Sequence, residues 1–315
     1  MLRATYERVL PLAAPDRVWV VTAAAHARRV RRELPEIPPG NVLREPAARN
    51  TGPAVTLASR VILARDPEAT LAVVPADSWV PQAGPYRSAL RSALAAAERH
   101  RQLVLVGVRP TRPETGYGYI EPGAPLSPGK ARAVKRFVEK PVLARARSYL
   151  KRGFLWNCGI FAWRAEDFLA TAEKTMPEVA QAFRPLQVRR VTRRLLERAY
   201  AASPTVSVDY GVMERADNCA VIPARFAWDD LGSWPALARL GTGSSFTHGT
   251  VIAEESPGLV AWAEQGVVAV VGVPDVVVVH TPDATLVVRK DLAQEVRSVV
   301  AKLEKNPRTR TLIEE

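Results

Sequence analysis

The sequence predicts an α/β protein with a Rossmann-like, mostly parallel mixed sheet and a small β-rich C-terminal region that ends in a helix. Two observations carry this prediction. Through the first half of the chain, short apolar segments alternate with segments whose apolar residues recur at helical spacing. This βαβ order implies parallel strands with helices on both faces of the sheet. The last part of the chain instead contains short valine-rich segments separated by turn residues.

The first half reads as a regular series of helices and strands. The opening MLRATYERVLPL has Leu2, Tyr6, Val9 and Leu10 at helical spacing, and the apolar strand RVWVVT follows at once. Ligands of an open α/β sheet bind at the carboxyl ends of its strands, so residues that follow strands are binding candidates. The later elements are a helix over 26–34, the strand VLREP, a helix over 52–65, the strand ATLAVVPAD, a helix over 85–100 and the strand QLVLVGV.

The second half of the chain changes character twice. A mixed region comes first, with YGYIEPG, KARAVKRFVEKP, a helix over 143–152, the strand NCGIFAW and a helical stretch over 165–200. The segment GTGSSFTHG predicts a linker, and the short strands after it close with a helix from Asp291 to about Lys305. We therefore expect a catalytic domain over 1–240, a linker over 241–250 and a β-rich region over 251–315.

Composition limits the class of protein. No apolar run reaches the roughly 18 residues of a membrane span, and the start lacks a signal-peptide pattern, so we expect a cytoplasmic protein without a membrane partner. Cys158 and Cys219 lack metal-ligand spacing and predict free thiols. The net charge of +12 is scattered over helical segments such as HARRVRREL, without a recognisable nucleic-acid module. No nucleic-acid partner is expected.

Acidic residues mark two candidate metal positions. Asp77 ends the predicted strand LAVVPAD, where a carboxylate can hold Mg²⁺ opposite a triphosphate. An aspartate there can equally cap a helix or form a turn. Asp229 and Asp230 in FAWDDLGSW precede a glycine that permits close backbone approach, although they also fit a solvated turn. Together the two segments form a plausible Mg²⁺ clamp.

Three further segments suit a sugar phosphate. RFVEKP places Glu139 and Lys140 at a strand end with opposite side-chain directions, which suits Lys140 to a phosphate and Glu139 to vicinal hydroxyls. An exposed strand end with ordinary charges is the structural alternative. LWNCGIFAW adds Asn157, and ETGYGYI adds glycines between tyrosines, both of which fit hydroxyl recognition. Each of these segments taken singly can also be a turn.

Seven segments follow one another along the chain: REPAARNTGPA, VVPADSWV, GYGYIEPG, RFVEKP, LWNCGIFAW, VSVDYGVME and FAWDDLGSW. Taken in order, they resemble the mannose-1-phosphate guanylyltransferase family, the GDP-mannose pyrophosphorylases. The resemblance implies a nucleotidyltransferase fold and runs from the first residue to about 240. An ordered series of this kind is far more specific than any one motif. VVVVHTPDATLVVRKDLAQEVRSVV is also similar to the family's C-terminal tail.

The resemblance implies a reaction in which GTP and mannose 1-phosphate give GDP-mannose and pyrophosphate with Mg²⁺ as cofactor. A sugar phosphate oxygen attacks the α-phosphorus in line, so catalysis is positioning and charge neutralisation, without a covalent intermediate. By motif position, the metal and the sugar phosphate are assigned to Asp77, Asp230 and Lys140. The remaining assignments are Glu139, Asn157 and the backbone near Gly118 for the sugar hydroxyls, Asn50 and Thr51 near the base, and Asp209 near the sugar pocket.

The sequence departs from the family pattern in two places. Ser78 stands where the family usually has a histidine, close to the expected metal. The opening strand and its glycine-rich loop, which in relatives grip the triphosphate through backbone N–H groups and cations, have no counterpart in the sequence. We therefore expect the sequence to start just beyond that segment.

Three functions stay open from the sequence alone. The first is a guanylyltransferase whose sequence starts downstream of its phosphate loop, and the second is a non-catalytic paralogue that binds nucleotide sugar. The third is a nucleotidyltransferase for another sugar 1-phosphate or another triphosphate, because base choice depends on a few hydrogen bonds. The β-rich tail can cover the sheet or form a homodimer contact.

Overall fold

The computed structural model describes residues 1–187, 191–240, 244–306 and 309, and it divides into two compact units, Met1–Trp228 and Asp229–Glu315. The domain bounds expected from the sequence, 1–240, 241–250 and 251–315, stay a prediction. Residues 241–243 of the predicted linker, and 307–308 and 310–315 of the predicted C-terminal region, lie outside the described residues. Within the described part of the chain, no helix has the length and apolar character needed to cross a membrane.

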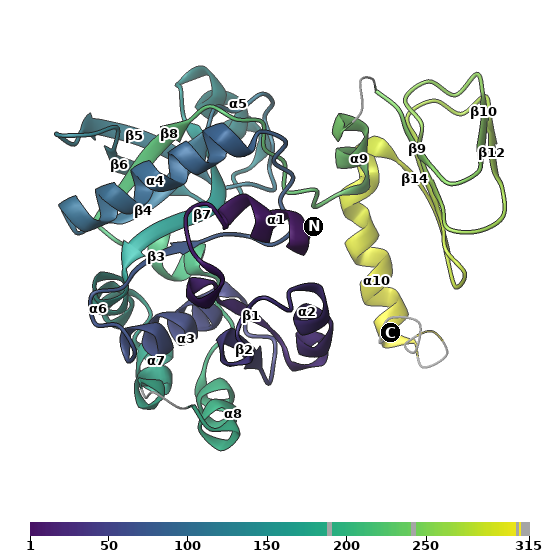
Figure 1. Ribbon diagram of the computed structural model, residues 1–315. Coiled ribbons are helices and arrows are strands. Elements are labelled where there is room, and N and C mark those ends of the chain that lie inside the picture. The colour runs from purple at the N-terminus through teal and green to yellow at the C-terminus, as the bar shows by residue number, and fades with distance from the viewer. Residues whose placement is uncertain (188–190, 241–243, 307–308, 310–315) are drawn as a thin grey trace. The chain divides into compact units, whose positions relative to one another are not determined.

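The first unit is built on a six-stranded mixed sheet with the order β3-β7-β4-β8-β6-β5 (Figure 1). β3, β4, β5 and β8 point one way, whereas β6 and β7 run the opposite way. Among the described strands of this sheet, β4 and β8 are the one parallel pair of neighbours; β7 lies between β3 and β4 and pairs antiparallel with both. The strands are β3 (Thr70–Val73), β4 (Leu103–Val108), β5 (Tyr119–Pro125), β6 (Arg132–Val138), β7 (Leu155–Arg164) and β8 (Cys219–Ala224).

Helices cover both faces of this sheet, as predicted. β4 is buried along its whole length, so its side chains alternate between two cores: Leu103 and Leu105 pack on one face, and Val104 and Val106 on the other. Figure 1 shows α4 on one side and α3, α6 and α7 on the other. The helices of the first unit are α1 (Leu2–Val9), α2 (Ala27–Glu33), α3 (Thr51–Leu63), α4 (Ala83–His100), α5 (Leu143–Lys151), α6 (Ala165–Thr175), α7 (Pro177–Phe183) and α8 (Arg193–Ala202).

A small parallel pair of strands lies outside the main sheet. β1 (Val20–Ala23) pairs in register with β2 (Val42–Glu45). A separate core of buried residues from α1, α2 and β2 packs beside this pair. The predicted strand RVWVVT therefore starts late, because Pro15–Arg17 forms a turn of 3₁₀-helix before it.

The strand that leads to Asp77 is shorter than the sequence predicts. β3 ends at Val73, and the loop that follows carries Asp77 as an exposed residue. Continued past Val73, the register of β3 against β7 would bring Val74 opposite Ile160 and then Pro75 opposite Gly159. Pro75 has no N–H to donate, and Gly159 has a φ of +66°, which is not extended backbone. Pairing therefore stops before Asp77.

Within the described residues, the helical stretch predicted over roughly 165–200 contains the three α-helices α6, α7 and α8; its residues 188–190 lie outside the described part of the chain. Pro177 starts α7, at the position where the missing N–H of proline costs nothing. The Thr192 hydroxyl caps α8 by accepting from the Leu195 N–H at 3.3 Å.

The second unit is rich in stacked strands. β9, β11 and β13 pair in parallel, β14 adds antiparallel to β13, and β10 pairs in parallel with β12. Because β9 is Phe246–His248, part of the predicted linker is a strand. The predicted terminal helix starts at Val296, after a 3₁₀ segment over Lys290–Glu295. The elements are α9 (Trp234–Leu237), β9, β10 (Val251–Glu254), β11 (Val260–Ala263), β12 (Val268–Val271), β13 (Val276–His280), β14 (Thr285–Arg289) and α10 (Val296–Lys305).

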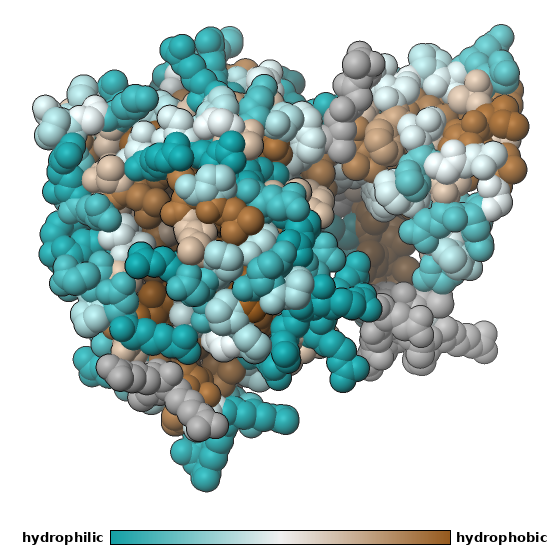
Figure 2. Space-filling model, in the orientation of Figure 1, coloured by the Kyte–Doolittle hydropathy of each residue, from teal (hydrophilic) through white to brown (hydrophobic). Residues whose placement is uncertain are grey.

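Exposed apolar side chains gather on one part of the second unit. Figure 2 shows hydrophobic residues where Figure 1 labels β10 and β12. Ile252, Val267 and Val271 are each more than half exposed. The homodimer contact expected for this region stays a prediction.

Candidate functional site

Five of the predicted site residues meet in one cluster in the first unit. The Asn157 N–H donates to the Gly118 carbonyl at 2.9 Å, and the Asn157 amide Nδ2 donates to Asp209 Oδ1 at 2.8 Å. Lys140 Nζ lies 3.2 Å from Glu139 Oε1. A Cβ atom on Gly118 would lie 2.6 Å from Glu139 Oε2, so the glycine loop passes directly over this carboxylate. We call Gly118, Glu139, Lys140, Asn157 and Asp209 the carboxylate–lysine cluster.

The backbone at Lys140 sets the arrangement of the EKP segment. β6 ends at Val138, and Lys140 has a φ of +46°, a left-handed conformation that is unusual for a residue with a side chain. Strained backbone of this kind concentrates at functional sites. The expectation that Glu139 and Lys140 point in opposite directions is wrong, because the strand does not continue through them and their charged groups form an ion pair.

The Glu139 carboxylate is buried and only partly satisfied. Its side chain is 8% exposed, and Oε2 has no hydrogen-bond partner among the described residues. Burial raises the pKa of Glu139 to about 7; the charge of Asp209 adds to the rise and Lys140 opposes it. Burial also raises the pKa of Asp209, against the hydrogen bond from Asn157. Buried acceptors normally find a donor, so Oε2 is suited to a ligand hydroxyl.

The raised pKa of Glu139 predicts a pH-dependent stability. Its folded-state pKa of about 7 lies above the ordinary value of 4.5, so the stability linked to its protonation is present below about pH 4.5 and is lost as the pH rises through 7. Glu139→Gln removes this titration. We expect the unfolding midpoint of Glu139→Gln to rise relative to the wild type by at least about 2 °C between pH 5 and pH 8. Glu98→Gln, on the exposed side of α4, is the control, and a difference that does not change with pH would refute the assignment.

The N-terminus of α3 lies close to the segment that carries Asp209. Thr51 Oγ1 accepts from the Val208 N–H at 2.9 Å, one residue before Asp209. Asn50 has a φ of +67°, and its side chain accepts from the Thr51 N–H at 2.8 Å. The structure therefore brings the segment predicted to lie near the base next to a π-helical turn over Asp209–Met213. Such turns are frequent at functional sites.

The two predicted metal ligands lie in different units. Asp77 belongs to the loop after β3, where the Pro75 ring would lie 3.1 Å from a Cβ on Gly159. That loop therefore passes close to Gly159, which is two residues after Asn157 in the chain. Asp230 belongs to the second unit, and its Oδ1 accepts from the Gly232 N–H at 3.0 Å. No group of three or more potential metal ligands occurs within the described ranges, and joint metal binding by Asp77 and Asp230 stays a prediction.

Asp229, the neighbour of Asp230, has a different position. It is buried, and Arg239 donates to both of its oxygens at 2.6 and 2.9 Å. This bidentate pair gives Asp229 a structural partner within its own unit.

The residues that hold the glycine loop were not among those predicted from the sequence. Glu114 Oε1 accepts from the N–H groups of Thr115 and Gly116 at 3.0 and 3.2 Å. The Arg112 guanidinium lies 4.9 Å from the centre of the Trp156 ring, next to Asn157 in the chain. An acid just before a glycine loop is a signal of such a turn, and it was present in RPETGYG.

Gly118→Ala tests whether the cluster is a binding site. The added methyl group would lie 2.6 Å from Glu139 Oε2 and 3.0 Å from Phe137 Cζ, so the Glu139 carboxylate must move. We expect mannose 1-phosphate to bind at least about tenfold more weakly, measured by isothermal titration calorimetry. Gly84→Ala in α4 is a matched control, because nothing lies within 4 Å of its added methyl group. Equal affinity in the two variants would contradict the site.

Comparison with known proteins agrees with both units. A family model described as nucleotidyl transferase matches residues 1–243, and one described as mannoseP isomerase/GMP-like beta-helix domain matches residues 249–303. The parallel stacked strands of the second unit agree with this description.

Individual relatives match over nearly the whole chain. Xanthan biosynthesis protein XanB of Xanthomonas campestris pv. campestris (strain B100) is 37% identical over 98% of this chain and 67% of its own length. A mannose-1-phosphate guanylyltransferase of Salmonella montevideo is 35% identical over 96% of this chain and 67% of its own length. The crystal structure of a protein named mannose-1-phosphate geranyltransferase, from Thermus thermophilus, has a TM-score of 0.85 and 38% identity, covering 96% of this chain and 89% of that one. The chain belongs to the nucleotidyl transferase family, and within it to the mannose-1-phosphate guanylyltransferases.

Proposed function

We propose that the protein transfers GMP from GTP to mannose 1-phosphate, giving GDP-mannose and pyrophosphate. The names of the relatives support this reaction. The observation that carries the proposal is the buried Glu139 carboxylate, whose Oε2 lacks a partner among the described residues, beside the Lys140 ammonium. A sugar phosphate requires this combination, since its hydroxyls need acceptors and its phosphate needs a cation.

Each residue of the carboxylate–lysine cluster has a role in this proposal. Lys140 binds the sugar phosphate, and half of its side chain is exposed to meet it. Glu139 accepts from the sugar hydroxyls. Asn157 has its amide fixed at both ends, because Oδ1 accepts from the Gly159 N–H at 3.1 Å while Nδ2 donates to Asp209. One lone pair and one N–H of the amide are left to read hydroxyls, in an orientation set before the substrate arrives.

The remaining predicted residues serve the nucleotide. Asn50 and Thr51 lie near the base, at the start of α3. Asp77 and Asp230 would hold Mg²⁺, which is bound in proteins by one or two carboxylates together with substrate phosphates. Asp77 fits this role, since it is exposed and its carboxylate makes no ion pair or hydrogen bond with the part of the chain that the structure describes. The bound ion would neutralise phosphate charge. The sugar phosphate oxygen then displaces pyrophosphate from the α-phosphorus in line, with Lys140 and the cluster orienting the nucleophile.

Comparative assays test the reaction. The protein is incubated with Mg²⁺, one of GTP, UTP, dTTP or ATP, and mannose 1-phosphate or glucose 1-phosphate. Pyrophosphate and nucleotide sugar are then quantified by chromatography. We expect GTP with mannose 1-phosphate to give the highest kcat/KM. A higher value for another pair would contradict the proposed substrates.

Binding measurements distinguish a non-catalytic paralogue from an enzyme that uses other substrates. GDP-mannose and UDP-glucose are titrated into the same preparation by calorimetry. Preferential binding of GDP-mannose without turnover would support a non-catalytic nucleotide-sugar-binding protein. Preferential binding of UDP-glucose would overturn the assignment of both base and sugar.

A further inference from the structure

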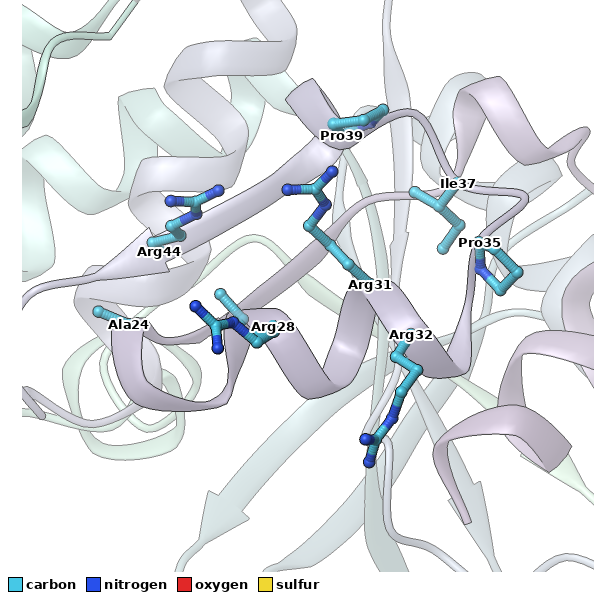
Figure 3. A pocket seen from close by; sticks show the side chains of 9 residues that line it. Ala24, Arg28, Arg31, Arg32, Pro35, Ile37, Pro39 and Arg44 are labelled. Carbon is cyan, nitrogen blue, oxygen red and sulfur yellow. The ribbon is translucent and has the colours of Figure 1, made fainter.

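A basic pocket lies outside the carboxylate–lysine cluster. It occupies about 540 Å³ between α2 and β2, and none of the predicted site residues lines it. Its floor contains the buried Ala27 and Ile37. Figure 3 shows Arg28, Arg31 and Arg44 beside the space between α2 and β2, whereas the Arg32 side chain extends to the other side of the helix. We call Arg28, Arg31 and Arg44 the arginine triad.

The positions of the triad follow from local structure. Arg28 and Arg31 are three residues apart on α2, and this spacing places them on one face of a helix. Arg44 comes from β2, where it pairs in register with Thr22 of β1. Ala24, which also lines the pocket, follows β1 directly. The pocket therefore runs along α2, from Ala24 after β1 to Pro35, Ile37 and Pro39, which precede β2.

The triad lacks counter-charges. None of its three arginines forms an ion pair or a side-chain hydrogen bond with any residue in the described ranges. The nearest acids have other partners. Glu45, next to Arg44, accepts from the Tyr200 hydroxyl at 2.9 Å, Glu36 pairs with Arg3 at 2.7 Å, and Glu33 lines a different pocket with Arg29. The three arginines are exposed and line one pocket without an acid among its lining residues, so the pocket favours an anion.

We propose that the arginine triad binds a small molecule carrying at least two linked phosphate groups, such as a nucleoside diphosphate or triphosphate. Guanidinium groups bind phosphate oxygens in a bidentate manner, and three of them match a diphosphate better than a single carboxylate. A volume of about 540 Å³ is in the range of small-molecule sites, and the apolar floor suits a base or a ribose. This site is additional to the proposed reaction and does not rest on it.

Calorimetry with pyrophosphate and with GDP tests the proposal. The test variant is the triple change Arg28→Ala, Arg31→Ala and Arg44→Ala, and the control is Arg29→Ala, Arg91→Ala and Arg297→Ala. The control removes the same charge from exposed positions outside the pocket. We expect the triple variant to bind both probes at least about tenfold more weakly at the pocket, with mannose 1-phosphate affinity within twofold of the wild type. The control should retain the wild-type affinity for all three ligands.

A charge-preserving variant tests the proposal even if the triple alanine variant does not fold. Arg31→Lys with Arg44→Lys keeps the charge and removes the planar fork, so its affinity for pyrophosphate should be intermediate between those of the wild type and the alanine variant. Equal pyrophosphate binding in the alanine variant and the control would overturn the proposal. Binding of a tetraglutamate peptide at this pocket as tightly as GDP would also overturn it, since the site would then recognise acidic peptide.

Discussion

Asp77→Asn should lower kcat at least about a hundredfold, and Asp230→Asn should have an effect of the same size. Asparagine keeps the shape of the side chain but removes the negative charge that holds a divalent cation. Asp77 is exposed and Asp230 is partly exposed, so the folded structure should persist in both variants. Initial rates of pyrophosphate release from GTP and mannose 1-phosphate, over a range of Mg²⁺ concentrations, measure the effect.

The neighbour of Asp230 supplies a matched control. Asp229 is buried and held by Arg239, so Asp229→Asn should lower the unfolding midpoint without changing the dependence of the rate on Mg²⁺. Near-normal turnover in both Asp77→Asn and Asp230→Asn would contradict the metal assignment. If only Asp229→Asn changed the dependence of the rate on Mg²⁺, the metal would be assigned to Asp229 instead.

Lys140→Ala should raise the KM for mannose 1-phosphate at least about tenfold while changing the KM for GTP much less. Two effects act in the same direction. The phosphate loses its cation, and the Glu139 carboxyl loses the charge that holds its pKa down, so it is protonated at a higher pH and accepts fewer hydrogen bonds from the sugar. If the contact with Lys140 tightens in the transition state, kcat falls as well.

A lysine on β6, just before the segment that carries Lys140, separates this effect from a general loss of charge. Lys135 lies on β6, is 65% exposed and pairs with Glu121 at 3.4 Å. Lys135→Ala should leave both KM values near those of the wild type. An effect of Lys140→Ala confined to GTP would show that Lys140 serves the nucleotide and not the sugar phosphate.

The sequence predicted which residues form the carboxylate–lysine cluster, but it did not predict how their side chains are arranged. Gly118, Glu139, Lys140, Asn157 and Asp209 come from four separate segments, and only the resemblance of ordered motifs indicated that they meet. Strand periodicity alone placed the Glu139 and Lys140 side chains on opposite sides. The left-handed conformation of Lys140 overrides that alternation, and a positive φ at a lysine has no signature in the residue sequence.

The main errors in the fold have tertiary causes. The segment ATLAVVPAD has the composition of one strand, but its pairing partner β7 has irregular backbone at Gly159, and β3 ends at Val73. β1 and β2 form a pair of their own outside the main sheet, which periodicity does not reveal. The arginine triad was also missed, because HARRVRREL was interpreted as scattered surface charge. The spacing of Arg28 and Arg31 indicated a shared helix face, but the contribution of Arg44 depends on the fold.

A crystal structure of the protein with mannose 1-phosphate would test the assignment of the sugar site most directly. We expect the phosphate to contact Lys140 Nζ, and the sugar hydroxyls to donate to Glu139 Oε2 and to lie within hydrogen-bond distance of the Asn157 amide. Gly118 should lie against the sugar without a side chain between them. Mannose 1-phosphate bound elsewhere, with Glu139 and Lys140 still paired only with each other, would contradict the proposed sugar site.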